Sequence, residues 1–190
     1  MGFAATRAAA TSLALGDYNK DGFEDVFLGR RELPGLIFTS DGRAESWKST
    51  DAPAATGDAD AALFADLDCD GWLDLITLAA GRLALDRGSN RAFTPFPPGT
   101  APDASLPARA LGVADVDRDG DLDIVLADSA SRPMVLTNDL ADAKSVIVTL
   151  AGRVSNKSGL GTKLDFRAGS LAQKIECGMS TPASTPATLH

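Results

Sequence analysis

The chain of 190 residues is acidic, with 26 Asp and Glu against 18 Lys and Arg and a formal net charge of −8. Its basic residues do not cluster, which argues against nucleic acid as a partner because phosphates are bound by basic patches. No run approaches the roughly eighteen apolar residues of a membrane span. The single histidine, His190, leaves no nucleophile and base from which to assemble a hydrolytic site.

An acidic nonapeptide occurs three times, at residues 17–25, 66–74 and 115–123. Each copy follows the pattern Asp-x-Asp/Asn-x-Asp-Gly-x-x-Asp, and the first aspartates are 49 residues apart both times. Half of the acidic residues lie in these copies, so the negative charge is concentrated there. The regular period indicates a repeat array with one acidic loop in every unit.

Apolar residues flank each nonapeptide with the spacing of β-strands. Before it, they stand four and two residues ahead of the first aspartate, which is the alternation of a strand. After it, a short run rich in β-branched and aromatic residues predicts a buried strand. The residues concerned are Leu13, Leu15, Ala62, Phe64, Leu111 and Val113 before the loops, and 26–28, 75–78 and 124–126 after them. Each loop is therefore expected to join two strands.

A third apolar stretch follows in every repeat, and in the first two a fourth segment ends on an aromatic residue, Trp47 or Phe96. Three to four strands in about fifty residues are typical of a β-propeller blade. We therefore predict an all-β fold of three propeller-type blades, at residues 9–57, 58–106 and 107–143. They would form part of a larger propeller, because about four to eight blades are needed for closure. Trp47, Phe96 and Phe27 are expected in the core, whereas Trp72 is expected to be partly exposed.

The nonapeptide has the chemistry of a calcium cage. Calcium takes about six to eight oxygens, and side-chain oxygens at positions 1, 3 and 5 of a tight loop can turn inward together. Glycine at position 6 permits a sharp reversal, position 7 can offer its backbone carbonyl, and position 9 closes the cage. The predicted ligands of about three Ca²⁺ ions are Asp17, Asn19, Asp21, Phe23, Asp25, Asp66, Asp68, Asp70, Trp72, Asp74, Asp115, Asp117, Asp119, Asp121 and Asp123. An EF-hand is disfavoured because position 12 is leucine or threonine. The alternative is three polar turns that bind nothing.

The charges of the loops predict unequal affinities. The first loop has Asn19 in place of an aspartate and Lys20 beside it, whereas the third has Asp121 in addition to its ligands. Because calcium is attracted to negative charge, we expect the first site to be the weakest and the third to be the tightest.

These loops, set between short strands, resemble the FG-GAP/VCBS repeats of integrin-type β-propellers over roughly residues 9–140. The resemblance implies that the positions named above bind calcium. After Lys144 the chain resembles the ASPIC/UnbV domain that often follows such repeats, on the residues Leu150, Gly152, Ser155, Asn156, Gly159 and Gly161. It implies a small β-rich domain at residues 144–190. Because the chain stops at Leu189 and His190, where that family's closing motif would begin, we expect a fragment or a shortened domain.

Loops of this kind suit the calcium concentrations found outside the cytoplasm, which together with the resemblance implies an extracellular or periplasmic protein. The start of the chain, residues 1–10, is too short and too weakly charged to predict a signal peptide. Cys69 and Cys177 are expected to be free thiols, since nothing in the sequence pairs them.

The function expected from these features is binding. Calcium would make the blades rigid, and their loops would recognise a glycan or an extracellular protein. Turnover is not expected, because a carboxylate that holds calcium cannot act as a general acid near neutral pH. The alternatives are a non-catalytic part of a secreted polysaccharide-active enzyme and a purely structural array. Further blades, from this or another chain, are expected as partners.

Overall fold

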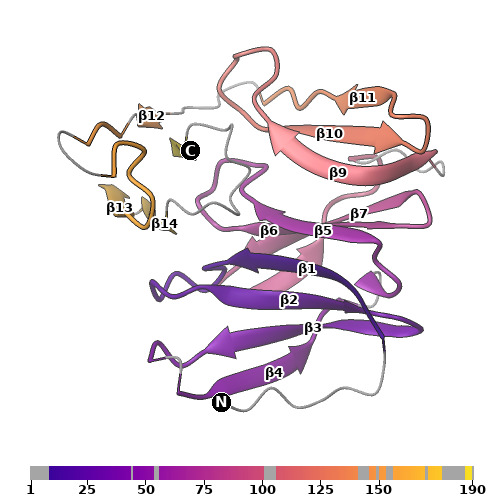
Figure 1. The fold of residues 1–190 in the computed structure, drawn as a ribbon, viewed down its shortest axis with the longest axis horizontal. Coiled ribbons are helices and arrows are strands. Elements are labelled where there is room, and N and C mark those ends of the chain that lie inside the picture. Colours follow the sequence, from indigo (N-terminus) through magenta and orange to yellow (C-terminus); the bar gives the residue numbers. More distant parts are fainter. Residues whose placement is uncertain are drawn as a thin grey trace.

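The computed structural model describes residues 9–43, 45–53, 56–100, 106–140, 146–148, 150–152, 156–169, 171–176 and 187–189. The secondary-structure elements of these residues are all β-strands, paired in antiparallel sheets (Figure 1). The predicted all-β fold is therefore confirmed. Nowhere in the described ranges does a helix reach the length and apolar character that crossing a membrane requires.

Each repeat forms one sheet, which we call a blade. Blade 1 has the strand order β1-β2-β3-β4 and blade 2 the order β5-β6-β7-β8, while blade 3 has the order β11-β10-β9 in its described part. The strands are β1 (Ala10–Gly16), β2 (Asp25–Arg30), β3 (Leu33–Ser40), β4 (Trp47–Asp51), β5 (Ala61–Ala65), β6 (Asp74–Ala79), β7 (Arg82–Ser89), β8 (Ala92–Pro95), β9 (Ala108–Ala114), β10 (Asp123–Asp128) and β11 (Pro133–Leu136). Every acidic loop joins the first two strands of its blade, as predicted.

Strand β6 explains why the blades stack. Leu75 packs into an apolar cluster shared with blade 1, whereas Ile76 and Leu78 pack into a second cluster shared with blade 3. Successive side chains of a strand point to opposite faces, so one uninterrupted apolar run supplies both interfaces. The apolar core therefore lies between neighbouring blades.

Aromatic side chains fill the interface between blades 1 and 2. Tyr18, Phe64 and Phe93 form a group of three rings whose centroids are 5.3 to 6.4 Å apart. Phe27 is fully buried in the same cluster, and Phe96 packs against the cluster between blades 2 and 3. The predicted core position of Phe27 is therefore confirmed, and Phe96 is partly buried at the edge of the core. Trp47, also predicted in the core, is half-buried and belongs to neither of the clusters that the described residues form.

The three blades stand side by side in an open, unclosed arrangement, and their first strands, β1, β5 and β9, are neighbours (Figure 1). On the outer side of blade 1, Leu13 and Leu15 are 56% and 46% exposed. Their counterparts one repeat later, Ala62 and Phe64, pack against blade 1. The exposed face of β1 therefore has the composition of a face that another blade covers.

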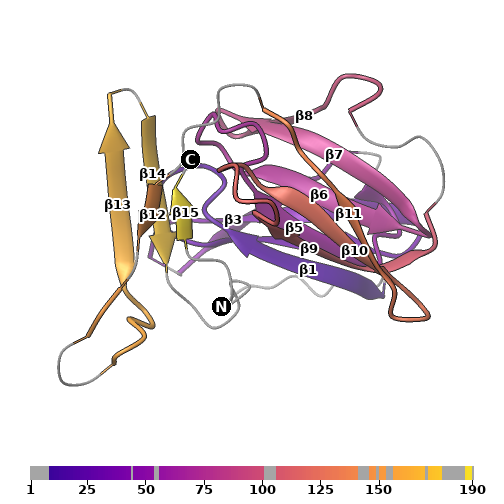
Figure 2. The same cartoon turned by 90° about the horizontal axis from the view of Figure 1, so that it is seen from above.

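The C-terminal part forms two small sheets beside the blades (Figure 2). In it, β12 (Val146–Val148) pairs with β15 (Ala187–Leu189), and β13 (Lys163–Ala168) pairs with β14 (Leu171–Glu176). The predicted β-rich character of this part is confirmed. The domain boundary predicted at 143/144 lies outside the described residues, as do Ser155, Cys177 and His190.

Asn156 organises the turn between β12 and β13. Its side chain donates to the carbonyl of Leu160 at 2.8 Å and accepts the N–H of the same residue at 2.9 Å. Gly159 and Gly161 follow with φ angles of 65° and 77°, a region that favours glycine. The Asn-x-x-Gly-x-Gly spacing is therefore the signature of a tight turn, while membership of the ASPIC/UnbV family stays a prediction.

Candidate metal centre

The three loops share one backbone conformation. The glycine at position 6 has φ of 92°, 85° and 104° in Gly22, Gly71 and Gly120, so the predicted need for glycine there is physical. Position 4 also lies in the left-handed region, although no glycine occupies it. Its residues are Lys20, Cys69 and Arg118, with φ of 59°, 57° and 67°.

Backbone N–H groups hold the position-1 carboxylate in place in the first two loops. In the first loop Asp17 accepts the N–H groups of Asp21 and Gly22 at 2.9 and 2.7 Å, and Asn19 Oδ1 also accepts the N–H of Asp21. In the second loop Asp66 accepts the N–H groups of Asp70 and Gly71 at 3.1 and 2.8 Å. The loop itself thus turns the oxygens of positions 1 and 3 towards one place.

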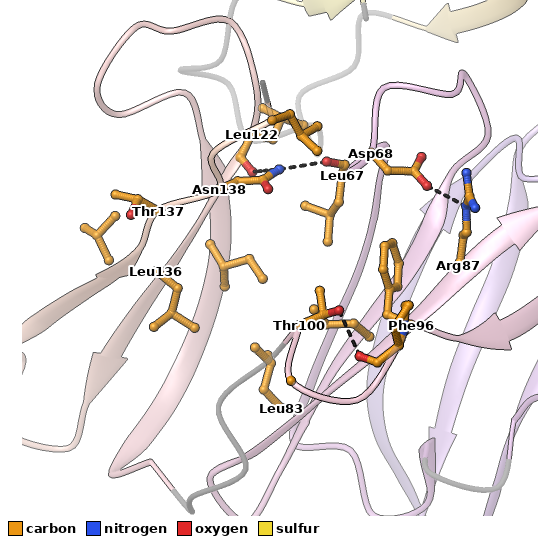
Figure 3. A pocket seen from close by; sticks show the side chains of 16 residues that line it. Leu67, Asp68, Leu83, Arg87, Phe96, Thr100, Leu122, Leu136, Thr137 and Asn138 are labelled. Atoms are coloured by element: carbon orange, nitrogen blue, oxygen red, sulfur yellow. Dashed lines mark hydrogen bonds and ion pairs between the residues drawn. The ribbon is translucent and has the colours of Figure 1, made fainter. Parts of the chain in front are cut away.

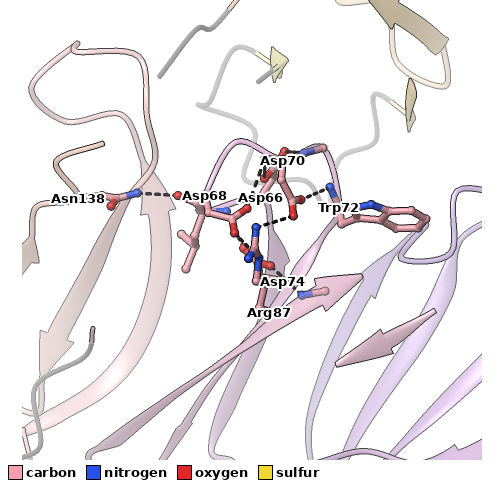
Figure 4. Close-up of polar contacts among 10 residues, drawn as sticks. Asp66, Asp68, Asp70, Trp72, Asp74, Arg87 and Asn138 are labelled. Carbon is pink, nitrogen blue, oxygen red and sulfur yellow. Dashed lines mark hydrogen bonds and ion pairs between the residues drawn. The ribbon is translucent and has the colours of Figure 1, made fainter. Parts of the chain in front are cut away.

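Two loops bring three carboxylates together. The clusters, in each of which carboxylate oxygens lie within 4.8 Å of one another, are Asp66, Asp68 and Asp74 in the second loop and Asp115, Asp117 and Asp119 in the third. Figure 4 shows the carboxylate cluster of the second loop, with Arg87 of β7 next to it. Asp66 and Asp74 are buried, whereas the third cluster is more open to solvent. The described residues contain no such group of three in the first loop, where an amide, Asn19, occupies position 3.

A divalent cation fits these donor sets. All the clustered atoms are oxygens, which hard cations such as calcium prefer. Asp115 Oδ1 is buried without a hydrogen-bond partner among the described residues, and a cation would satisfy it. Burial, and then the neighbouring charges of Asp70 and Asp68, raise the pKa of Asp66 to about 7. A bound cation would remove this penalty by favouring the ionised form.

The aspartate at position 9 has a structural task as well. It is fully buried in all three loops, and its carboxylate accepts an N–H from the third strand or the residues just after it. The pairs are Asp25 with Ser40 at 2.9 Å, Asp74 with Gly88 at 2.8 Å, and Asp123 with Asn138 at 2.9 Å. Burial raises the pKa of Asp25 to about 7 and that of Asp74 to about 8. Position 9 therefore ties the loop to the blade, whether or not it also holds a metal.

Position 7 differs among the loops. Phe23 is exposed, Trp72 is half-buried, and Asp121 is buried with its carboxylate accepting the N–H of Leu140 at 2.9 Å. Lys20 reaches from the first loop to the second, where its Nζ lies 3.9 Å from the centre of the Trp72 ring. Metal ligation by the carbonyls at position 7 stays a prediction.

Arg87 of β7 contacts the second loop, which the sequence did not predict. Its guanidinium contacts Asp68 Oδ2 through Nε and Asp70 Oδ2 through Nη2, the latter at 3.0 Å (Figure 4). Arg87 is the residue directly before Gly88, whose N–H bonds to the position-9 aspartate. The equivalent residues in blades 1 and 3 are Thr39 and Thr137. The predicted order of affinities took no account of this positive charge.

Cys69 is a free cysteine at position 4 of the second loop. Burial and the surrounding carboxylates, Asp66 first among them, raise the pKa of its thiol to about 12. It is therefore a protonated, unreactive side chain at neutral pH. The expectation of a free thiol is confirmed for Cys69.

A cavity of about 780 Å³ lies between blades 2 and 3, next to the second loop (Figure 3). Its walls are largely apolar and include Leu83, Phe96 and Leu136, while Asp68 and Arg87 line the side towards the loop. An apolar cavity with a few polar groups at one side is the usual form of a small-molecule site.

Comparison with known proteins identifies the repeats. No curated protein matches the chain. The FG-GAP-like repeat family matches it twice, over residues 17–77 and 66–126. Each match begins at position 1 of a loop and ends in the second strand of the next blade, and together they span more than half of the 190 residues. The chain therefore belongs to the FG-GAP-like repeat family.

Proposed function

We propose that this chain is a calcium-binding repeat module that acts outside the cytoplasm by binding a glycan or a protein surface, with calcium in a structural role. The observation that carries the proposal is the pair of carboxylate clusters in the second and third loops. FG-GAP-like repeats are typical of extracellular adhesion-type modules, which supports both the location and the absence of turnover.

In the second loop Asp66, Asp68 and Asp74 would hold the ion, and in the third loop the cluster that begins at Asp115 would do so. In the first loop the corresponding donors are Asp17, Asn19 and Asp21. A bound calcium supplies two positive charges to oxygens that otherwise repel one another at close range. Because each loop joins two strands, the ion would stabilise the blade to which the loop belongs.

A binding role also has a place in the fold. The cavity between blades 2 and 3 offers apolar walls at Leu83 and Phe96 and a polar side at Arg87. It suits a ligand with an apolar body and polar groups at one edge, such as a sugar face or a protein side chain. Asp68 lines the cavity and also belongs to the carboxylate cluster of the second loop, so calcium in that loop would influence ligand binding in the cavity.

The exposed face of β1 supports a further blade as a neighbour. Leu13 and Leu15 are the repeat counterparts of Ala62 and Phe64, which pack against blade 1. A blade of the same or another chain would cover these side chains in the same way.

Calcium dependence is tested by melting the protein in chelator and in calcium. An ion present at about a hundred times its dissociation constant stabilises the folded state by about 2.7 kcal/mol per site. For a chain of this size that corresponds to a rise in Tm of roughly 5 to 11 °C per site. We expect elemental analysis of the dialysed protein to find calcium. An equal Tm in both conditions, with no metal found, would refute the proposal.

The binding role is tested separately, by probing arrays of glycans and of extracellular matrix proteins with and without calcium. We expect at least one signal that disappears in chelator. Hydrolysis of a polysaccharide by the purified chain, abolished by a point substitution within it, would instead establish an enzyme.

A further inference from the structure

Gln173 of β14 reaches the second loop from the C-terminal part of the chain. It is 8% exposed, and its Nε2 donates to Asp66 Oδ2 at 2.8 Å. Its other polar atom, Oε1, is buried and has no hydrogen-bond partner among the described residues. The side chain thus ends at the carboxylate cluster with a carbonyl oxygen left unsatisfied.

A buried amide oxygen without a partner destabilises a protein by about 1 to 3 kcal/mol. The N–H groups of Asp70 and Gly71 both bond to Asp66, the carboxylate that Gln173 contacts. The group that would satisfy Oε1 is one that Asp66 also attracts, namely a cation. Side-chain amide oxygens are ordinary calcium ligands, and a half-turn of the amide exchanges its oxygen with its nitrogen.

The second loop also has reason to need a ligand from outside. Arg87 contacts both Asp68 and Asp70, so part of the loop's own charge is already neutralised. Calcium takes about six to eight oxygens, more than the three clustered carboxylates bring as single donors. An amide oxygen adds a ligand without adding a further charge to a crowded cluster.

The hairpin that carries Gln173 is held over the loops at a second point. Lys163 of β13 has its Nζ 5.4 Å from the centre of the Phe23 ring in the first loop. Lys163 and Ile175 also line a small hollow together with Asp17. The β13–β14 hairpin therefore contacts the first loop as well as the second.

We propose that Gln173 is a ligand of the calcium ion in the second loop, and that this ion fastens the β13–β14 hairpin to blade 2. The inference rests on the proposed calcium function. Linkage makes the effect reciprocal: calcium stabilises the docked hairpin, and the docked hairpin raises the affinity of the second loop by the same factor.

Terbium is the probe for this test, because it replaces calcium at oxygen sites and its luminescence is sensitised by a nearby tryptophan. The chain has two tryptophans, Trp47 and Trp72, and only Trp72 belongs to a loop. Because Trp72 also lies close to Lys20 of the first loop, the background is Trp47→Phe with Asp17→Ala, which disables the first site, and tryptophan-sensitised emission then reports on the second loop. Emission lifetimes in H₂O and D₂O count the water molecules on the ion.

We expect Gln173→Ala to weaken terbium binding at the second loop by roughly tenfold and to add about one water to the ion. Gln173→Glu is the decisive second variant, because a carboxylate can ligate the ion but cannot donate to Asp66. A ligand role predicts that Gln173→Glu binds terbium at least as tightly as the parent, with unchanged hydration. A merely structural hydrogen bond predicts that both variants fail alike, and that result would overturn the proposal.

Arg167→Ala is the matched control, since this exposed side chain pairs only with Asp165 on its own strand among the contacts described. It should leave affinity and hydration unchanged. Titration calorimetry of the parent measures how many calcium ions bind, and so tests calcium binding separately from ligation by Gln173. Absence of any calcium binding would defeat the proposed function. Calcium binding that persists unaltered in Gln173→Ala, with no change in hydration, would defeat the role of Gln173 alone.

Discussion

Replacing Arg87 by threonine should tighten calcium binding at the second loop. Blades 1 and 3 have threonine at the position equivalent to Arg87, so this side chain is compatible with the blade structure. In the native chain the guanidinium contacts Asp68 and Asp70, which are predicted ligands. A calcium ion must therefore displace or tolerate a positive charge at a place where the other two blades have an uncharged threonine.

The size of the effect follows from Coulomb's law. Two unit charges 4 Å apart interact by about 1 kcal/mol in water, so a divalent ion meets about 2 kcal/mol of repulsion at that distance. Arg87 is 47% exposed and can swing into solvent, and salt screens what remains. We expect a gain of about 1 to 2 kcal/mol, which is roughly five- to thirtyfold in affinity.

Titration calorimetry of the parent and of Arg87→Thr at low and high salt measures this gain. Only one site should change, and the difference should shrink as salt rises. Arg82→Thr, at the start of the same strand, is a control that removes an arginine away from the loop. Equal affinities for the parent and Arg87→Thr at low salt would refute the electrostatic reasoning.

Three further substitutions separate the roles of individual aspartates. Asp74→Ala removes the acceptor of two buried backbone N–H groups, those of Leu67 and Gly88, so it should destabilise the protein by about 2 to 4 kcal/mol even in chelator, as measured by urea unfolding. Asp68→Ala should lower calcium affinity while changing the stability in chelator by less than about 1 kcal/mol. Asp86→Asn should flatten the pH dependence of stability between about pH 4 and 6, because burial raises the pKa of Asp86 to about 6.

The direction of the pH effect is fixed by linkage. Asp86 is 1% exposed, and its Oδ2 has no hydrogen-bond partner among the described residues. Because the folded state holds the proton of Asp86 more tightly than the unfolded state, the contribution of Asp86 to stability is highest below pH 4 and falls as pH rises through 6. At pH 8 the asparagine variant should be more stable than the parent by up to about 3 kcal/mol. Unfolding of both proteins in saturating calcium at pH 4.5 and 8 tests this, and parallel pH curves would contradict it.

Much of the fold could be predicted because it depends on local pattern. The 49-residue period locates the loops, and apolar alternation locates the strands on both sides of each loop. Gly71 illustrates the same point for the site, since position 6 requires a positive φ of 85° that glycine adopts without strain. These features follow from residues that are close together in the chain.

The parts of the site that were not predicted come from distant segments. Gln173 lies 107 residues beyond Asp66, and the sequence has no period or motif that links them. Arg87 is nearer, but its contact with Asp68 depends on the register of β7 in blade 2. The double use of Asp74, as a cluster member and as an acceptor of backbone N–H groups, also requires the three-dimensional register.

The sharing of apolar residues across blade interfaces has a consequence for how the protein unfolds. Blade 2 buries Leu75 against one neighbour and Ile76 against the other, so it has little interior of its own. Stability in such an array is approximately a sum of nearest-neighbour terms, as in a one-dimensional chain of coupled units. A defect in blade 1 is therefore passed on to blade 3 chiefly through the two apolar interfaces of blade 2. The shortest segment able to unfold cooperatively is a pair of adjacent blades, and whole repeats can be gained or lost during evolution without redesign of the remaining interfaces.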